Sequence, residues 1–107
     1  MSWKEKAKSQ KVSSFQMKVY SVVSKIPLGK VTTYGAIAKK LGASPRAVGQ
    51  ALRKNPFAPE VPCHRVVGSG GRIGGFKGKS CGKAIAEKIS LLEKEGVVIK
   101  AKKIIKI

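Results

Sequence analysis

Two short helical segments joined by a very tight turn limit the folds open to this chain. The first is predicted over about residues 34–40 and ends at Gly42, a typical C-terminal stop. The second is predicted over 45–54, because Ser44 followed by Pro45 is typical of an N-cap and a first helical position. Small and basic residues are frequent in the second segment, and this pattern indicates a helix-turn-helix. Many small helix pairs bind nothing, so the pattern alone does not fix a function.

The charge of the chain supports a polyanionic partner. Among 107 residues, 23 Lys and Arg stand against 5 Asp and Glu, which gives a formal net charge of +18. Such an excess cannot be neutralised internally and therefore faces a polyanion, with nucleic acid as the first candidate. A ribosomal-type protein, solubility by charge alone and an anionic membrane surface are the alternatives. The length predicts one domain, over residues 13–107.

The other segments predict a mainly α fold with short β elements. Residues 1–12 are rich in Lys and Ser and are expected to form a mobile basic arm, although Trp3 could dock on the core. Apolar residues at helical spacing predict amphipathic helices over about 14–25 and 82–95. Residues 97–107 are typical of a strand with a basic edge, or of a sticky tail.

Membrane and secretory signals are missing from the sequence. No run approaches the roughly 18 apolar residues of a membrane span, and no signal-peptide core precedes a cleavage site. We therefore expect an intracellular protein without membrane association, cytoplasmic in a prokaryote or nuclear in a eukaryote. Cys63, Cys81 and a single histidine are too few for a standard zinc site, so no metal is expected. A disulfide between the cysteines is conceivable, but a reducing compartment would keep both as thiols.

The segment 61–67, VPCHRVV, carries the most reactive combination of side chains. A thiolate is a strong nucleophile, whereas a free cysteine is mostly protonated at neutral pH, so Cys63 needs a neighbour that accepts its proton or stabilises the anion. His64, directly or through a water, and the charge of Arg65 are the candidates. Consecutive side chains of an extended segment point apart, so this contact requires the bend that Pro62 favours or a bridging water. The alternative is an inert buried cysteine followed by a surface histidine.

A glycine-rich stretch follows at residues 68–82 and holds seven of the twelve glycines. It is too rich in glycine to pack as a core segment, yet it includes basic residues. Neither dinucleotide-binding nor Walker spacing is present, so a phosphate-cradling loop is disfavoured. A basic loop or wing beside a nucleic-acid groove explains the stretch better.

Five short motifs follow one another along the chain: GKVTTY at 29–34, RAVG at 46–49, Asn55-Pro56, PCHRVV at 62–67 and Glu95-Gly96. Together they resemble the O6-alkylguanine-DNA alkyltransferases, also called methylated-DNA–protein-cysteine methyltransferases. The resemblance covers about residues 14–97 and implies the catalytic domain alone, with a winged helix-turn-helix-like DNA-binding fold. It also implies DNA repair by direct reversal, in which a monomer without a cofactor binds double-stranded DNA in the minor groove and flips out the O6-alkylguanine. The alkyl group is then expected to pass irreversibly to a cysteine.

Carried over residue by residue, the resemblance assigns five catalytic roles. Cys63 is the alkyl acceptor. His64 acts as its base through a water and is oriented by Glu95, so that the carboxylate stabilises the protonated imidazole. Asn55 braces the loop that carries the cysteine, and Tyr34 crowds the target phosphate and donates a proton to the leaving purine.

The resemblance also assigns the DNA contacts and the pocket. Arg46 is the finger that fills the gap left by the flipped base, and small residues let the helix approach the minor groove. Lys77 departs from the family pattern, since many relatives carry a hydroxyl residue there. The DNA contacts expected are Thr33, Tyr34, Arg46, Ala47, Gly49, Arg53 and Ser69. The pocket residues expected are Val66, Gly74, Phe76 and Lys77.

Other functions remain open from the sequence. Alkyltransferase-like proteins share this fold but lack the acceptor cysteine, and they flag damage without repairing it. The presence of Cys63 argues against that function. An unrelated winged-helix regulator would not require a Cys-His pair after its recognition helix, and a cysteine hydrolase would require an acyl-substrate site that the sequence does not indicate.

Overall fold

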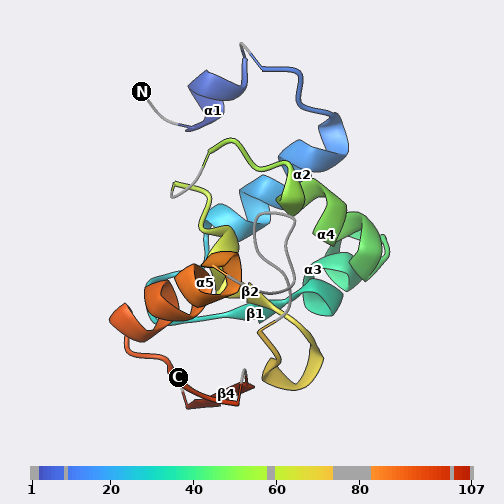
Figure 1. The fold of residues 1–107 in the computed structure, drawn as a ribbon. Helices are drawn as coiled ribbons and strands as arrows, with labels where there is room; N and C mark the ends of the chain where they lie inside the picture. Colours follow the sequence, from blue (N-terminus) through green and yellow to red (C-terminus); the bar gives the residue numbers. More distant parts are fainter. Residues whose placement is uncertain (1–2, 9, 58–59, 74–82, 102, 107) are drawn as a thin grey trace.

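The computed structural model describes residues 3–8, 10–57, 60–73, 83–101 and 103–106 (Figure 1). Helices dominate, and the strands are short, which confirms the predicted mainly α fold. The helices are α1 Trp3–Ala7, α2 Ser14–Ser24, α3 Tyr34–Leu41, α4 Pro45–Arg53 and α5 Lys83–Lys94. The strands are β1 Thr32–Thr33, β2 Val66–Val67, β3 Val98–Lys100 and β4 Lys103–Lys106, and the 3₁₀ turns are η1 Cys63–Arg65 and η2 Ser69–Gly71.

Helices α3 and α4 form the predicted helix-turn-helix. The side chain of Thr33 caps α3 by accepting from the amide of Ala36 at 3.0 Å, and Gly42 ends the helix with a left-handed φ of 65°. The hydroxyl of Ser44 then accepts from the amide of Ala47 at 3.1 Å and opens α4. Each cap satisfies a backbone amide that the first turn leaves without a partner, so the local sequence fixes both helix starts.

Helix α2 packs across this pair and begins at the N-cap Ser13, which forms a capping box with Gln16. Its residues Val19, Tyr20 and Val23 are fully buried. The hydroxyl of Tyr20 donates to the carbonyl of Ala51 at 2.7 Å, so a buried hydrogen bond joins α2 to α4. This bond fixes α4, which carries the predicted DNA-contact residues, against the core.

The N-terminal segment differs from the mobile arm that we predicted. Residues Trp3–Ala7 form helix α1, which lies beside α2 at the top of Figure 1. Trp3 is 7% exposed and belongs to the main core cluster. The large apolar area of one tryptophan outweighs the polar composition around it, and the docked alternative is therefore the one that the structure has.

A small parallel sheet, formed by β1 and β2, connects the helix-turn-helix to the segment that carries Cys63. Thr32 pairs with Val66, and Thr33 pairs with Val67. Because β1 leads directly into α3 and β2 follows η1 directly, this pairing sets the start of α3 beside the segment that carries Cys63. Residues far apart in the sequence thereby meet at one place.

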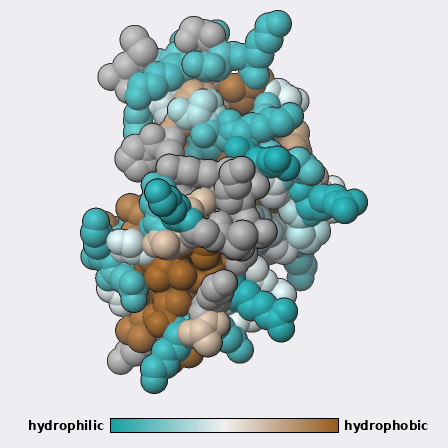
Figure 2. Space-filling model, viewed as in Figure 1, coloured by the Kyte–Doolittle hydropathy of each residue, from teal (hydrophilic) through white to brown (hydrophobic). Residues whose placement is uncertain are grey.

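Helix α5 and the C-terminal hairpin cover the other side of this sheet. Strands β3 and β4 pair in antiparallel fashion around Ala101, whose φ is 51°, so the single strand or tail that we predicted is a hairpin. Figure 2 shows apolar side chains at the surface in the lower part of the molecule, where α5 and the hairpin lie. Exposed apolar residues of the hairpin include Val98 and Ile105. Among the described residues, no helix is both long and apolar enough to cross a membrane.

Candidate active site and DNA-contact surface

Cys63 begins the 3₁₀ turn η1, immediately after Pro62. The residue is of intermediate exposure, and its amide donates to the carbonyl of Val61 at 2.8 Å. The segment is therefore bent rather than extended, as Pro62 indicated. The bend leaves the residue partly exposed while its backbone is held, an arrangement that suits a nucleophile.

His64 lies behind the cysteine in a buried cluster of ionisable side chains. Its Nε2 atom is 2.7 Å from Oε2 of Glu95, and the two side chains are only 7% and 12% exposed. Arg65 completes the cluster: its Nε donates to Oε1 of Glu95 at 2.9 Å and its Nη2 donates to Oε2 at 3.0 Å. A bidentate guanidinium fixes the plane of the carboxylate, and the carboxylate fixes the imidazole. The structure thus brings together His64 and Glu95, which the family pattern paired across 31 positions of the sequence.

Backbone features hold Glu95 at this place. Arg65 also donates through Nη1 to the carbonyl of Ile26 at 2.8 Å. Gly29 has a φ of 84°, and a β-carbon on it would lie 3.3 Å from the carbonyl oxygen of Glu95, so a side chain there would crowd the backbone that carries the carboxylate. Gly96, with a φ of 92°, ends α5 directly after Glu95. The turn at Gly29 therefore packs closely against the end of α5.

The electrostatics of the cluster keep the carboxylate ionised. The Arg65 hydrogen bonds, with a smaller contribution from His64, lower the pKa of Glu95 from 4.5 to about 2. A carboxylate that stays charged stabilises a protonated imidazole and holds its tautomer. The cluster can therefore accept a proton at His64 without having to rearrange.

Lys88 is the functional candidate that sequence reasoning missed. Its side chain is fully buried under the site, and Nζ donates to the carbonyls of Val66 and Ile73, at 2.8 Å and 2.5 Å. Burial lowers the pKa of Lys88 to about 8, and the negative charge of the Cys63 thiolate opposes that shift. The spacing Ile85, Lys88, Leu92 was a usable signal, because it places the lysine on the apolar face of α5.

Tyr34, the first residue of α3, faces the same group of residues. The Nζ atom of Lys88 lies 5.7 Å from the centroid of its ring. Burial, followed by the negative charge of Cys63, raises the pKa of Tyr34 to about 12. The phenol therefore stays protonated at neutral pH and can act as a hydrogen-bond donor near the thiol.

Asn55 ends the α4 region and braces the loop that leads to the cysteine. Its Nδ2 donates to the carbonyl of Val61 at 3.0 Å, and its Oδ1 accepts from the amide of Phe57 at 2.9 Å. Both ends of the side-chain amide are thus used within one loop. This geometry is the one that the bracing role predicted for Asn55 requires.

The predicted DNA contacts lie on α4, at the start of α3 and in η2. Arg46 and Arg53 are exposed, and Ala47 and Gly49 are partly exposed. A β-carbon at Gly49 would have no atom within 4 Å, so the protein itself does not need glycine there. Thr33 caps α3 beside Tyr34, and Ser69 lies exposed in η2 after β2.

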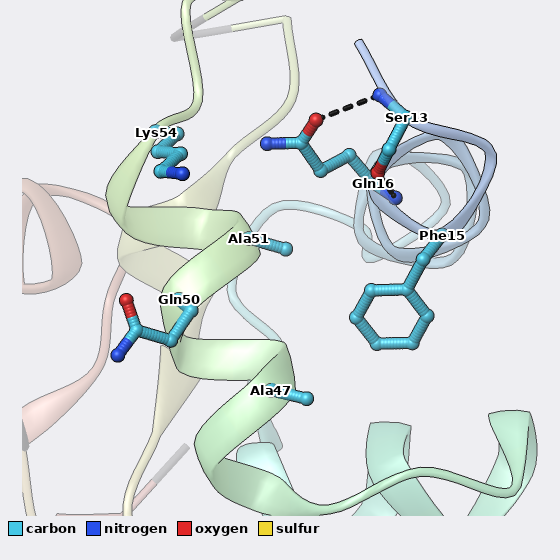
Figure 3. A pocket seen from close by; sticks show the side chains of 7 residues that line it. All are labelled: Ser13, Phe15, Gln16, Ala47, Gln50, Ala51 and Lys54. Atoms are coloured by element: carbon cyan, nitrogen blue, oxygen red, sulfur yellow. Dashed lines mark hydrogen bonds between the residues drawn. The ribbon is translucent and has the colours of Figure 1, made fainter.

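An open groove runs between α4 and the first turn of α2 (Figure 3). Side chains of α4 form one wall and those of α2 form the other, with the ring of Phe15 pointing between the two helices. The groove reaches Ala47, so its polar groups lie beside the predicted DNA-contact surface. Its lining residues are Ser13, Phe15, Gln16, Ala47, Gln50, Ala51 and Lys54.

The pocket prediction is only partly covered by the structure. Val66 is fully buried in β2, and its carbonyl is one of the two that accept from Lys88. The predicted pocket residues Gly74, Phe76 and Lys77, together with Cys81, lie outside the described residues. Within the described ranges, no group of three or more His, Cys, Asp or Glu residues could hold a metal ion.

Comparison with known proteins agrees with this arrangement. A methylated-DNA–protein-cysteine methyltransferase of Saccharolobus islandicus is 49% identical over 89 residues, which are 83% of this chain and 55% of the relative. The chain therefore spans about half the length of the curated relatives it matches. The crystal structure of the O6-methylguanine-DNA methyltransferase from Pyrococcus kodakaraensis superposes with a TM-score of 0.70 at 47% identity, covering 80% of this chain and 48% of that one.

A second solved structure is closer in length. Atl1 of S. pombe, in complex with damaged DNA containing O6-carboxymethylguanine, has a TM-score of 0.72 at 38% identity, over 85% of this chain and 83% of Atl1. The family model for the DNA-binding domain of 6-O-methylguanine DNA methyltransferase matches residues 14–97. Because that model covers most of the chain and a curated relative is nearly half identical, the chain belongs to the 6-O-methylguanine DNA methyltransferase family through its DNA-binding domain.

Proposed function

We propose that this chain repairs O6-alkylguanine in duplex DNA by transferring the alkyl group irreversibly to Cys63. The observation that carries the proposal is the partly exposed Cys63, which lies next to the buried His64–Glu95–Arg65 cluster and beside a helix-turn-helix. The names of the relatives, methylated-DNA–protein-cysteine methyltransferases, describe the same chemistry. The net charge of +18 suits a DNA substrate.

Activation of the thiol is the first step. His64 uses Nε2 for Glu95, so Nδ1 is the nitrogen that would accept the proton of Cys63 through a water. The imidazolium that forms is stabilised by the ionised Glu95. Lys88 adds a positive charge under the thiolate, which favours the nucleophilic form.

Alkyl transfer is then a direct displacement. The Cys63 sulfur forms a bond to the alkyl carbon while the bond from that carbon to O6 breaks, and the electron pair stays on the guanine. The protonated Tyr34 phenol supplies a hydrogen bond or proton to the purine as it leaves. The thioether product has no leaving group that water displaces, so each molecule reacts once.

The base must leave the helix before this reaction, because a stacked guanine cannot reach a buried pocket. Helix α4 approaches the minor groove through Ala47 and Gly49, whose small side chains permit close contact. Arg46 is exposed on the same helix and occupies the gap in the base stack. In this proposal Thr33, Arg53 and Ser69 contact the DNA backbone, and the family pattern assigns Val66, Gly74, Phe76 and Lys77 to the pocket.

The test is intact-mass spectrometry after mixing the protein with a duplex that carries one O6-methylguanine, followed by peptide mapping. A gain of one methyl group on Cys63, with no further gain in excess DNA, is the expected result. Cys63→Ser should bind the duplex without gaining mass. Transfer retained by Cys63→Ser would refute the assignment of the nucleophile.

A damage-recognition protein is the second candidate, because Atl1 matches this chain over most of both lengths and was solved with damaged DNA. Tight binding of the O6-methylguanine duplex without any mass gain would favour this function. If the protein does not bind the duplex and does not gain mass, both candidate functions are contradicted.

A further inference from the structure

We propose that helix α1 is a positioning clamp that acts through Trp3. It holds the segment that leads to Cys63, of which residues 55–57 and 60–62 are described, and this role rests on the proposed function of Cys63. Helix α1 precedes residues 14–97, where the family model matches, so the clamp lies outside the matched domain. Trp3 and Lys6 act as positioning residues in this proposal.

Trp3 contacts the loop directly. The centroid of its ring lies 5.7 Å from that of Phe57, in a tilted arrangement, and 6.3 Å from that of Tyr20, edge to face. Tyr20 and Phe57 also meet edge to face at 5.6 Å. All three rings are buried, and aromatic pairs of this geometry are favourable beyond the area they bury. The ring of Phe57 is therefore enclosed between α1 and α2.

Hydrogen bonds connect the backbone of Phe57 to the backbone of Cys63. The Phe57 carbonyl accepts from the amide of Val61 at 3.0 Å, and the Val61 carbonyl accepts from the amide of Cys63 at 2.8 Å. Asn55 bonds to Phe57 and to Val61. A displacement of the Phe57 ring would thus move the backbone on which the thiol is mounted.

A second contact of α1 lies at Glu60, next to Val61 in the chain. Lys6 donates to Oε1 of Glu60 at 2.6 Å. The pKa of Glu60 is lowered chiefly by this hydrogen bond, and the backbone amide of Trp3 also donates to the carboxylate. Because the ion pair is exposed, its net energy is small, and it serves to fix the direction in which α1 lies. Helix α1 therefore contacts this segment at two places, Phe57 and Glu60, both on the N-terminal side of Val61.

The experiment measures the first-order rate of methyl transfer at saturating O6-methylguanine duplex for the chain of 107 residues. Trp3→Ala should slow transfer by about tenfold, because a misplacement of about 1 Å can cost about a hundredfold in rate and Asn55 still holds the segment. The Kd for undamaged duplex should change by less than about twofold, since no charge is altered. Trp3→Phe, which keeps an aromatic ring, should recover most of the rate. Transfer by folded Trp3→Ala at the wild-type rate would overturn the clamp.

A matched control separates positioning from stability. Val23→Ala removes apolar volume from a fully buried position of α2 that is not one of the three aromatic contacts. Both variants should lower the thermal midpoint, but Val23→Ala should keep the wild-type transfer rate while it is folded. An equal loss of rate in Val23→Ala would show that Trp3 acts through stability alone, and the clamp would be rejected.

A second readout keeps the clamp testable if the proposed function fails. The rate at which iodoacetamide alkylates Cys63 is measured against pH, with peptide mapping to separate Cys63 from Cys81. Trp3→Ala should shift this profile relative to wild type and Val23→Ala, because the thiol moves relative to His64 and Lys88. An absence of methyl transfer by wild type, together with a shifted profile, would reject the repair function and retain the clamp. An unshifted profile would reject the clamp.

Discussion

Replacement of Glu95 by glutamine tests the buried ionic cluster. The pKa of Glu95 is lowered from 4.5 to about 2, chiefly by the hydrogen bonds from Arg65. A carboxyl group whose pKa is lower in the folded state stabilises the fold at pH values above its unfolded pKa. That stabilisation is lost as the pH falls through the folded pKa. The relevant window is therefore between pH 4.5 and about 2.

The size of the effect follows from the two pKa values. The difference between 4.5 and about 2 corresponds to about 3 kcal/mol of unfolding free energy at neutral pH. The wild-type protein should lose most of this between pH 4.5 and pH 2. Glu95→Gln should be less stable by about 3 kcal/mol at pH 7, because Arg65 and His64 lose their counter-charge. Its stability should change little across the acid window.

Urea unfolding followed by circular dichroism at pH values from 7 to 2 gives both curves. The chain is suited to this measurement because it contains only five acidic residues, so few other groups titrate in the same window. Glu60→Gln is the matched control, since Glu60 pairs with Lys6 at the surface, where solvent screens the pair. It should retain the wild-type acid dependence. A Glu95→Gln variant with the same acid dependence as wild type would refute the reasoning.

Four other predictions test the site and the DNA-contact surface. Gly49→Ala should raise the unfolding free energy by about 0.5–1 kcal/mol, because its β-carbon meets open space, and it should weaken duplex binding. Thermal unfolding measures the first effect, and a binding titration measures the second. Lys88→Met should destabilise the fold by about 1–3 kcal/mol, since two buried carbonyls lose their donor, and alkylation of Cys63 should then require a higher pH. Arg46→Ala should slow repair of duplex far more than reaction with free O6-benzylguanine, and equal losses would contradict base flipping. Affinity for duplex should fall steeply between low and moderate salt, by roughly a thousandfold if about six phosphates are contacted, and a flat response would argue against DNA.

The helix-turn-helix could be predicted because its signals are local. Ser44 with Pro45, and Gly42 after an apolar helix, each specify a boundary through a hydrogen bond or a φ value within a few residues. The reactive centre depends instead on distant pairs. The sequence alone offers no reason to set Glu95 against His64, and only the family resemblance connected them.

The features that were missed share one cause, which is that burial overrode the polarity of single residues. Lys88 is classed as a surface residue by type, yet two backbone carbonyls and the ring of Tyr34 receive its ammonium group inside the fold. The lysine-rich start of the chain was expected to be mobile, yet the ring of Trp3 packs against a buried aromatic ring. Periodicity and composition do not report such partners, because the partners come from elements far away in the sequence.

The charged residues of this chain, whose formal net charge is +18, occupy two different environments. Exposed cations such as Arg46 and Arg53 suit a phosphate backbone, and salt screens their field. The charges around Cys63 are enclosed: Glu95 lies between Arg65 and His64, and Lys88 is held by carbonyls. Enclosed pairs are screened far less, so the acid–base properties of the site are insulated from the proposed DNA-contact surface. Under the proposed function, one small domain binds a polyanion through a salt-sensitive surface, while the charges around Cys63 respond little to salt.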